Sequence, residues 1–77
     1  MKHASVDKAS MIAPHEQRVL DESAELHERI NRLVAFVGEN PIYQTLPHDE
    51  KRLLSQQLQA MQAYHGALKA RIMRFIR

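Results

Sequence analysis

Apolar residues recur at alternating intervals of four and three along two long stretches of the chain. In the first stretch the recurring positions are Val19, Ser23, Leu26, Ile30, Leu33 and Val37. In the second they are Leu54, Leu58, Met61, His65, Leu68, Ile72 and Phe75. This spacing is typical of a coiled-coil seam, in which each helix keeps one face against a partner helix. The pattern therefore predicts two long helices, each with a single apolar stripe.

Proline, glycine and acidic residues mark where these helices begin and end. Pro14 suits the first turn of a helix, because the N–H group that proline lacks has no partner there. Pro47 is followed closely by Asp49 and begins the second helix in the same way. Gly38 and Pro41 are typical of a helix C-terminus and are expected to end the first helix.

These signals divide the chain into an arm and one helical domain. Residues 1–13 have neither helical nor strand periodicity, and we expect them to form a flexible N-terminal arm. Residues 14–77 form the hairpin domain, with a helix over 14–38, a connector over 39–46 and a helix over 47–76. Ile42 and Tyr43, in the connector, are expected to pack under the helix ends.

The lengths of the two stripes predict an all-α antiparallel hairpin. A short connector favours a second helix that runs back along the first. Val19 to Val37 and Leu54 to Ile72 both span eighteen residues, so the two stripes match end to end. His65 then lies level with Leu26 of the first helix.

Apolar residues outside the stripes predict self-association. A 77-residue chain has a small core, and this one contains no cysteine with which to form a disulfide. Further apolar side chains, which a single hairpin would expose, are Leu20, Val34, Phe36, Leu53, Met73 and Ile76. Because exposed apolar patches commonly mark interfaces, we expect the hairpins to assemble into an oligomeric helical bundle.

Charge is distributed unevenly along the chain. The net charge is +2, yet residues 51–77 carry six lysines and arginines and no carboxylate. One interpretation is that this basic helix pairs along its flank with the more acidic first helix. The other is that it forms a site for an anion.

Several classes of function lack support in the sequence. The Met1–Pro14 segment contains no continuous apolar stretch, so we expect a cytoplasmic protein without a signal peptide or membrane segment. Nucleophile, phosphate-loop and dinucleotide motifs are absent, and we expect neither an enzyme nor a bound cofactor. No two histidines are four residues apart, which argues against a metal site on one helix. His65 is interpreted either as a hydrogen-bonded core residue or as a ligand or switch.

Tyr64, Lys69, Arg71 and Arg74 are the residues with the clearest chemical potential. Tyr64 and Arg71 are seven residues apart and share one side of a helix. An aromatic ring can stack on a nucleobase, and guanidinium groups form bidentate hydrogen bonds to phosphate. The alternative is that Tyr64 covers the hairpin core while the arginines only solubilise the protein. Duplex nucleic acid is disfavoured as a partner because the net charge is small and aromatic residues are few.

Several short motifs resemble a family of small phage proteins. In chain order they are Arg18-Val19, Ala24-Glu25-Leu26, Phe36, Gln57-Met61-Tyr64 and Leu68-Arg71-Ile72. In the order and spacing of these motifs, the chain resembles the helical-hairpin domain of anti-CBASS and anti-Thoeris nucleotide sponges.

The resemblance implies an oligomeric bundle that sequesters cyclic oligonucleotide immune signals, without degrading them, in the cytoplasm of the infected bacterial host. It implies ligand sites between subunits and adds Arg18 to Tyr64 and Arg71 as residues to test. Two other functions stay open. One is a protein-interaction module that inhibits a host or defence protein, and the weaker one is nucleic-acid binding through residues 69–77.

Overall fold

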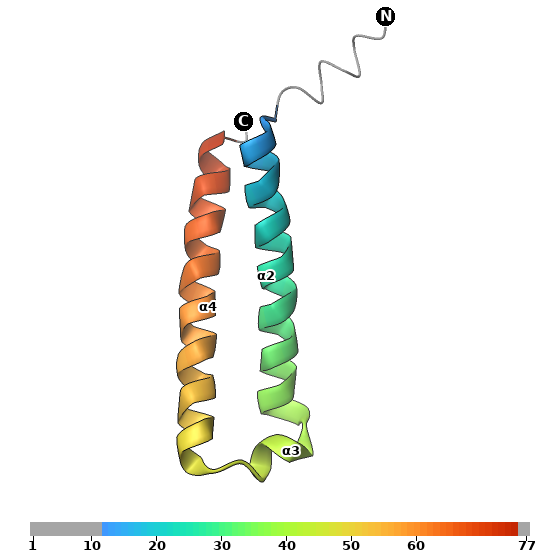
Figure 1. The fold of residues 1–77 in the computed structure, drawn as a ribbon, viewed down its shortest axis with the longest axis vertical. Coiled ribbons are helices and arrows are strands. Elements are labelled where there is room, and N and C mark those ends of the chain that lie inside the picture. The colour runs from blue at the N-terminus through green and yellow to red at the C-terminus, as the bar shows by residue number, and fades with distance from the viewer. Residues whose placement is uncertain (1–11, 76–77) are drawn as a thin grey trace, which may run out of the picture.

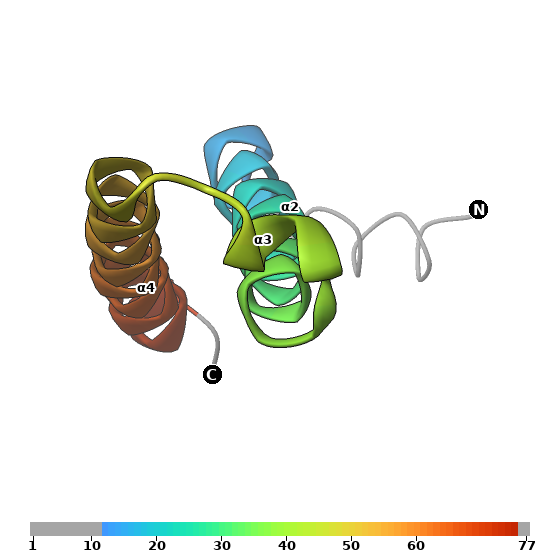
Figure 2. The ribbon, with the colours of Figure 1, turned by 90° about the horizontal axis from the view of Figure 1, so that it is seen from below.

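The computed structural model describes residues 12–75 as three helices joined by short connections. Helix α2 covers Pro14–Glu39, α3 is the single turn Pro41–Gln44, and α4 covers His48–Phe75. The chain reverses at α3, so α2 and α4 lie side by side and antiparallel (Figure 1). Viewed end-on, the two long helices form adjacent columns, with α3 crossing the end of α2 (Figure 2). The predicted all-α fold with two contacting long helices is confirmed.

The first long helix begins as predicted and ends beyond the glycine that was expected to stop it. Its first turn is closed by Glu16, whose Oε1 accepts a hydrogen bond from the Ala13 backbone N–H at 3.0 Å. Gly38 lies within α2, and the backbone becomes extended only at Asn40 (φ −86°, ψ 123°). The ring of a proline disfavours the helical conformation in the residue before it, so Asn40–Pro41 ends the helix.

The connector is structured by contacts to both long helices. The Asn40 Oδ1 accepts a hydrogen bond from the Ile42 N–H at 2.9 Å, which caps α3. Tyr43 packs edge-on against Phe36, with 6.0 Å between the ring centres, and the Lys51 Nζ lies 5.3 Å from the Tyr43 ring centre. Tyr43 thus joins the two helix ends as expected, whereas Ile42 is 59% exposed and does not.

The core is a single line of side chains between α2 and α4. Val19, Leu26, Ile30 and Leu68 are its buried apolar residues. Ser23 is buried among them, and partly buried side chains pack around this line from α4, namely Leu58, Met61, Ile72 and Phe75. Every position of the two predicted stripes is buried or half-buried. The 3.5-residue pattern thus identified the inward faces of both helices.

A contact between two histidines shows the axial register of the hairpin. His27 of α2 and His65 of α4 stack with 5.4 Å between their ring centres. His27 directly follows Leu26, so His65 lies level with Leu26, as the equal stripe lengths predict. Among residues 12–75, His65 has no hydrogen-bond partner, and it is held by ring stacking instead of the hydrogen bond considered from sequence.

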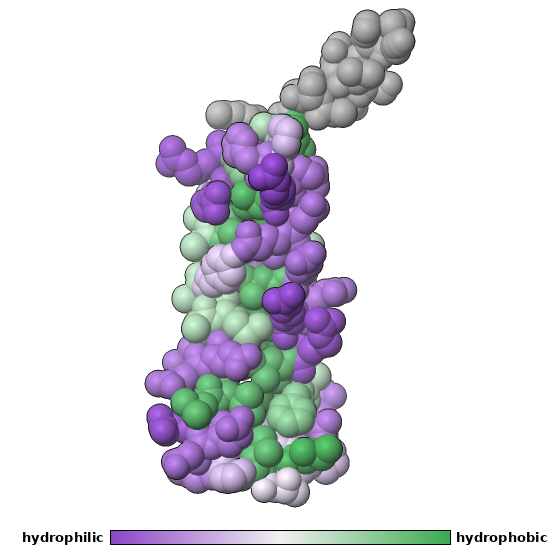
Figure 3. Space-filling model, in the orientation of Figure 1, coloured by the Kyte–Doolittle hydropathy of each residue, from purple (hydrophilic) through white to green (hydrophobic). Residues whose placement is uncertain are grey.

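Large apolar side chains remain on the outside of the hairpin. They are Val34, Ile42, Leu53, Tyr64 and Met73, with exposed fractions between 45% and 77%. Hydrophobic surface is visible on one face in the space-filling view, much of it near the connector (Figure 3). Two helices in contact can bury only the sides that face each other, so these outer residues are left in solvent.

Among residues 12–75, Leu68 is the most deeply buried side chain, at 1% exposure. We predict that Leu68→Ala lowers the free energy of unfolding by about 2–5 kcal/mol, through lost burial and the cavity left behind. Circular dichroism during urea denaturation measures this change. Gln59→Ala is the control on the same helix, because Gln59 is exposed. Equal destabilisation by both variants would contradict the assignment of the core.

Gly66 lies in the interior of α4, where a methyl group added at its Cα meets no atom within 4 Å. Glycine lowers helix stability because it has more backbone freedom to lose on folding. We therefore predict that Gly66→Ala raises the free energy of unfolding by about 0.5–1 kcal/mol. Thermal denaturation followed by circular dichroism tests this, and a lower midpoint for the variant would show that the glycine is needed for another contact.

Candidate functional site

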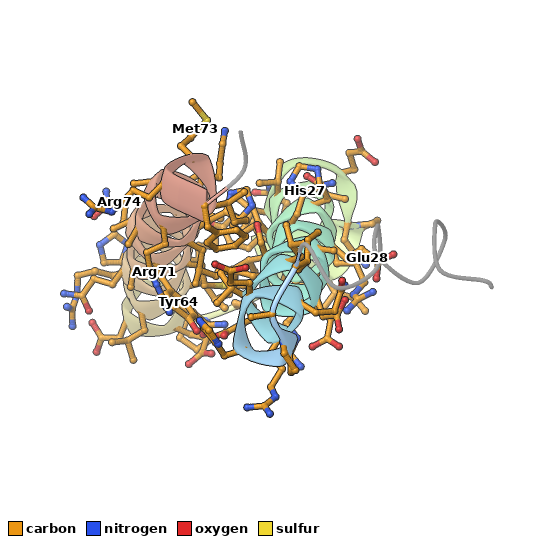
Figure 4. The ribbon with its side chains drawn as sticks, turned by 90° about the horizontal axis from the view of Figure 1, so that it is seen from above. His27, Glu28, Tyr64, Arg71, Met73 and Arg74 are labelled. Atoms are coloured by element: carbon orange, nitrogen blue, oxygen red, sulfur yellow. The ribbon has the colours of Figure 1, made fainter. Side chains whose placement is uncertain are left out.

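Tyr64 and Arg71 lie on the same side of α4, as their seven-residue spacing predicts (Figure 4). Tyr64 is 45% exposed and Arg71 is also exposed, so both side chains are accessible to a ligand. Seven residues correspond to about 10 Å along a helix axis. The pair therefore presents an aromatic ring and a guanidinium group separated by about two helical turns.

The other candidate residues of α4 take different positions around the helix. Arg74 follows Arg71 by three residues, so the two are neighbours on the helix surface. Lys69 is two residues before Arg71, a spacing that places side chains on opposite sides of a helix. Both Lys69 and Arg74 are exposed. The structure thus places Tyr64 and Arg71 together, with Arg74 next to Arg71 toward the outer side of α4, and separates Lys69 from them (Figure 4).

Arg18 of α2 is exposed and lies on the same side of the hairpin as Tyr64. It precedes His27 by nine residues, or about two and a half turns, so the two point to opposite sides of α2. Figure 4 places His27 on one side of the hairpin and Tyr64 and Arg71 on the other. We call this side, defined by Arg18, Tyr64, Arg71 and Arg74, the basic flank.

A recess of about 310 Å³ lies at the open end of the hairpin and includes part of the basic flank. Arg71, Arg74 and Phe75 line it from α4, and His15 and Glu16 line it from α2. Phe75, His15 and Glu16 were not among the candidate residues chosen from the sequence. The matched stripes contained a signal for them, because placing Val19 near Ile72 also brings the start of α2 to the end of α4.

The cations of the basic flank have no carboxylate partner among residues 12–75. The ion pair found in this part of the chain joins Arg32 to Glu28 at 3.7 Å, within α2, and both side chains are more than 70% exposed. Such surface pairs contribute little to stability. Flank-to-flank pairing of α2 with α4, one of the two interpretations of the charge distribution, is therefore not observed in the described residues.

Glu16 is the carboxylate that lines the open-end recess, and it already has a hydrogen-bond partner. Its Oε1 accepts from the Ala13 backbone N–H, which holds the carboxylate at the first turn of α2. Arg71 and Arg74 then supply two positive charges against one negative charge in the recess. The excess of positive charge favours an anionic ligand.

A larger recess of about 560 Å³ lies at the connector end, far from the basic flank. It is lined by Arg32, Ala35, Phe36, Glu39, Asn40 and Pro41. Its one lining cation, Arg32, is paired with Glu28, and Glu39 adds a further negative charge. Because Arg32, Glu28 and Glu39 together carry one net negative charge, this recess does not favour an anion, and we place the candidate site at the open end.

The described residues also limit other kinds of site. Within residues 12–75, no group of three or more histidine, aspartate or glutamate side chains is arranged to hold a metal ion. None of the helices in this range is long and apolar enough to cross a membrane.

The fold and the site together define a small helical-hairpin protein with its polar chemistry on an exposed cationic and aromatic flank. Residues 13–74, which include both long helices almost entirely, match the Sequestin family. The chain belongs to the Sequestin family. Neither the curated proteins nor the solved structures contain a match to it.

The basic flank should bind polyphosphate anions. We predict that inorganic pyrophosphate raises the thermal midpoint of the protein at low salt, because it binds the folded state only. Arg71→Gln and Arg74→Gln should each remove at least half of that rise. Lys69→Gln is the matched control, since it removes the same charge from the opposite side of α4. An equal loss in Lys69→Gln would indicate a general charge effect in place of a site.

Proposed function

We propose that this protein sequesters a small anionic nucleotide, which it binds on the basic flank and does not convert. The observation that carries the proposal is that Arg71, without a carboxylate partner among residues 12–75, lies on the same side of α4 as the exposed Tyr64, with Arg74 next to Arg71 on the outer side of the helix (Figure 4). The name of the Sequestin family denotes sequestration and supports a binding function.

The spacing of the flank suits a nucleotide that has both a base and a phosphate. A base stacks on the Tyr64 ring, and a phosphate accepts paired hydrogen bonds from Arg71, about 10 Å along the helix. Arg74 and Arg18 supply further positive charge at the open end of the hairpin. A cyclic oligonucleotide provides several bases and phosphates within such a distance, and we propose this class of ligand.

A protein of this kind removes signal molecules by binding them in a fixed ratio, without converting them. Each bound molecule lowers the free concentration of the signal, so no catalytic residue is assigned. By its resemblance to anti-CBASS and anti-Thoeris hairpin proteins, the chain is proposed to be a phage anti-defence protein. It would act in the cytoplasm of the infected bacterial host, where such immune signals are made.

Self-association completes the proposed site. Leu53, Tyr64 and Met73 of α4 are all at least 45% exposed, and Val34 of α2 is 46% exposed. A homo-oligomer would cover such side chains and would enclose the shallow basic flank between subunits. Enclosure matters for affinity, because a ligand on one open flank remains largely solvated.

Calorimetric titration with cyclic dinucleotides, cyclic trinucleotides and linear adenosine nucleotides tests the proposal. We predict that at least one cyclic nucleotide binds at micromolar concentration or below, and that chromatography recovers it unchanged after incubation. Tyr64→Ala and Arg71→Gln should each weaken binding about five- to 150-fold, since base stacking and bidentate phosphate contacts are each worth about 1–3 kcal/mol.

Controls and assembly are measured in the same series. Lys69→Gln should bind within about twofold of the unmodified protein, and native mass spectrometry should detect an oligomer with bound nucleotide. If no member of the panel binds at low salt, the proposal is wrong.

A second function, inhibition of a host or defence protein, is favoured by one observation. Met73 is 77% exposed and points away from the side that carries Tyr64 and Arg71 (Figure 4). If this surface binds a partner protein, affinity purification should recover one host protein in a fixed ratio, and Met73→Glu should abolish its recovery. A sponge alone would recover no such protein.

A further inference from the structure

The stacked histidines His27 and His65 lie outside the basic flank, on the opposite side of the hairpin. The two rings come from different helices, with 5.4 Å between their centres and an angle of 28° between their planes. Among the described residues, neither imidazole has a hydrogen-bond or ion-pair partner. The ring nitrogens are therefore available to a ligand.

The neighbours of the pair are almost all uncharged. Residues three or four positions from either histidine on its own helix are Ser23, Ala24, Ile30, Asn31, Met61, Gln62, Leu68 and Lys69. None of them is a carboxylate, and Lys69 is the single cation. The pair thus offers imidazole nitrogens with no carboxylate oxygen among these residues, which suits a ligand that binds imidazole.

Transition-metal ions bind neutral imidazole, and the separation of the rings suits one ion between them. A zinc ion about 2.0–2.1 Å from one nitrogen of each ring, at a tetrahedral angle, places the ring centres about 5.2 Å apart. The observed separation is 5.4 Å. The rings are stacked with 28° between their planes, so each ring has to turn about its Cβ–Cγ bond, which leaves its centre nearly in place, to direct a nitrogen at the shared ion. His27 is exposed and His65 is half-buried, so an ion can reach the pair from solvent and keep water as its other ligands.

We propose that His27 and His65 together bind one divalent transition-metal ion, of the class of Zn²⁺, Ni²⁺ or Cu²⁺, that joins α2 to α4. Imidazole favours these ions over Mg²⁺ and Ca²⁺, which prefer oxygen ligands. With two protein ligands, binding is weaker than at a closed four-ligand site, so the hairpin folds without the ion and is stabilised by it. The seam has few buried residues, and a link halfway along it opposes separation of the helices.

Thermal denaturation of the untagged full chain tests this proposal. We expect 0.1–1 mM Ni²⁺ or Zn²⁺ to raise the midpoint by several degrees, EDTA to reverse the rise, and Mg²⁺ to have no effect. His27→Ala and His65→Ala should each abolish the rise, whereas His48→Ala should retain it. Lowering the pH from 7.5 to 5.5 should also abolish it, because protonated imidazole does not bind metal.

Two further measurements distinguish a link within one chain from other modes of binding. An equimolar mixture of His27→Ala and His65→Ala should show no rise, since no chain in it holds both histidines. His27→Gln keeps a polar side chain at the exposed position and should also lose the rise, which guards against a folding defect in the alanine variant. A rise that persists in either single variant, reappears in the mixture or is absent from the unmodified protein would overturn the proposal.

Discussion

Two helices in contact touch along one line, and that geometry governs the rest of this molecule. Each helix contributes a row of inward side chains at intervals of four and three, and the two rows together form the entire core. Among residues 12–75, the buried apolar residues are Val19, Leu26, Ile30 and Leu68. Because there is no second layer, each of them carries a large share of the stabilisation, and most of the surface of each helix faces solvent.

The same geometry explains why the functional chemistry lies on the flanks. Because apolar side chains fill the seam, a polar ligand is held more readily on an outer side or at an end of the hairpin. Arg71 and Arg74 meet the start of α2 at such an end. They have no carboxylate partner in residues 12–75, which leaves their charge available to an anion. A shallow site of this kind gains affinity when a second hairpin covers it.

Opposite sides of the hairpin therefore carry different chemistry. The basic flank combines guanidinium groups with an exposed phenol ring and suits an anion with planar bases. The other side carries two stacked imidazoles, supplied by both helices, and suits a metal cation. These properties are compatible because the seam between them is apolar and keeps the two sets of side chains apart.

The sequence by itself determined the helices, their inward faces and their register, because helix periodicity is a local property and both stripes have equal length. It also placed Tyr64 and Arg71 together, since residues two turns apart must share a side. The end of the first helix was predicted less well, because Gly38 is compatible with a helix and the conformational restriction comes from Pro41. The stripe lengths predict which levels of the two helices match, but only the tertiary structure decided which side chains at those levels touch. His15 and Arg71 line one recess, and His27 stacks on His65. Both arrangements depend on packing between segments far apart in the chain, and no local spacing encodes such packing.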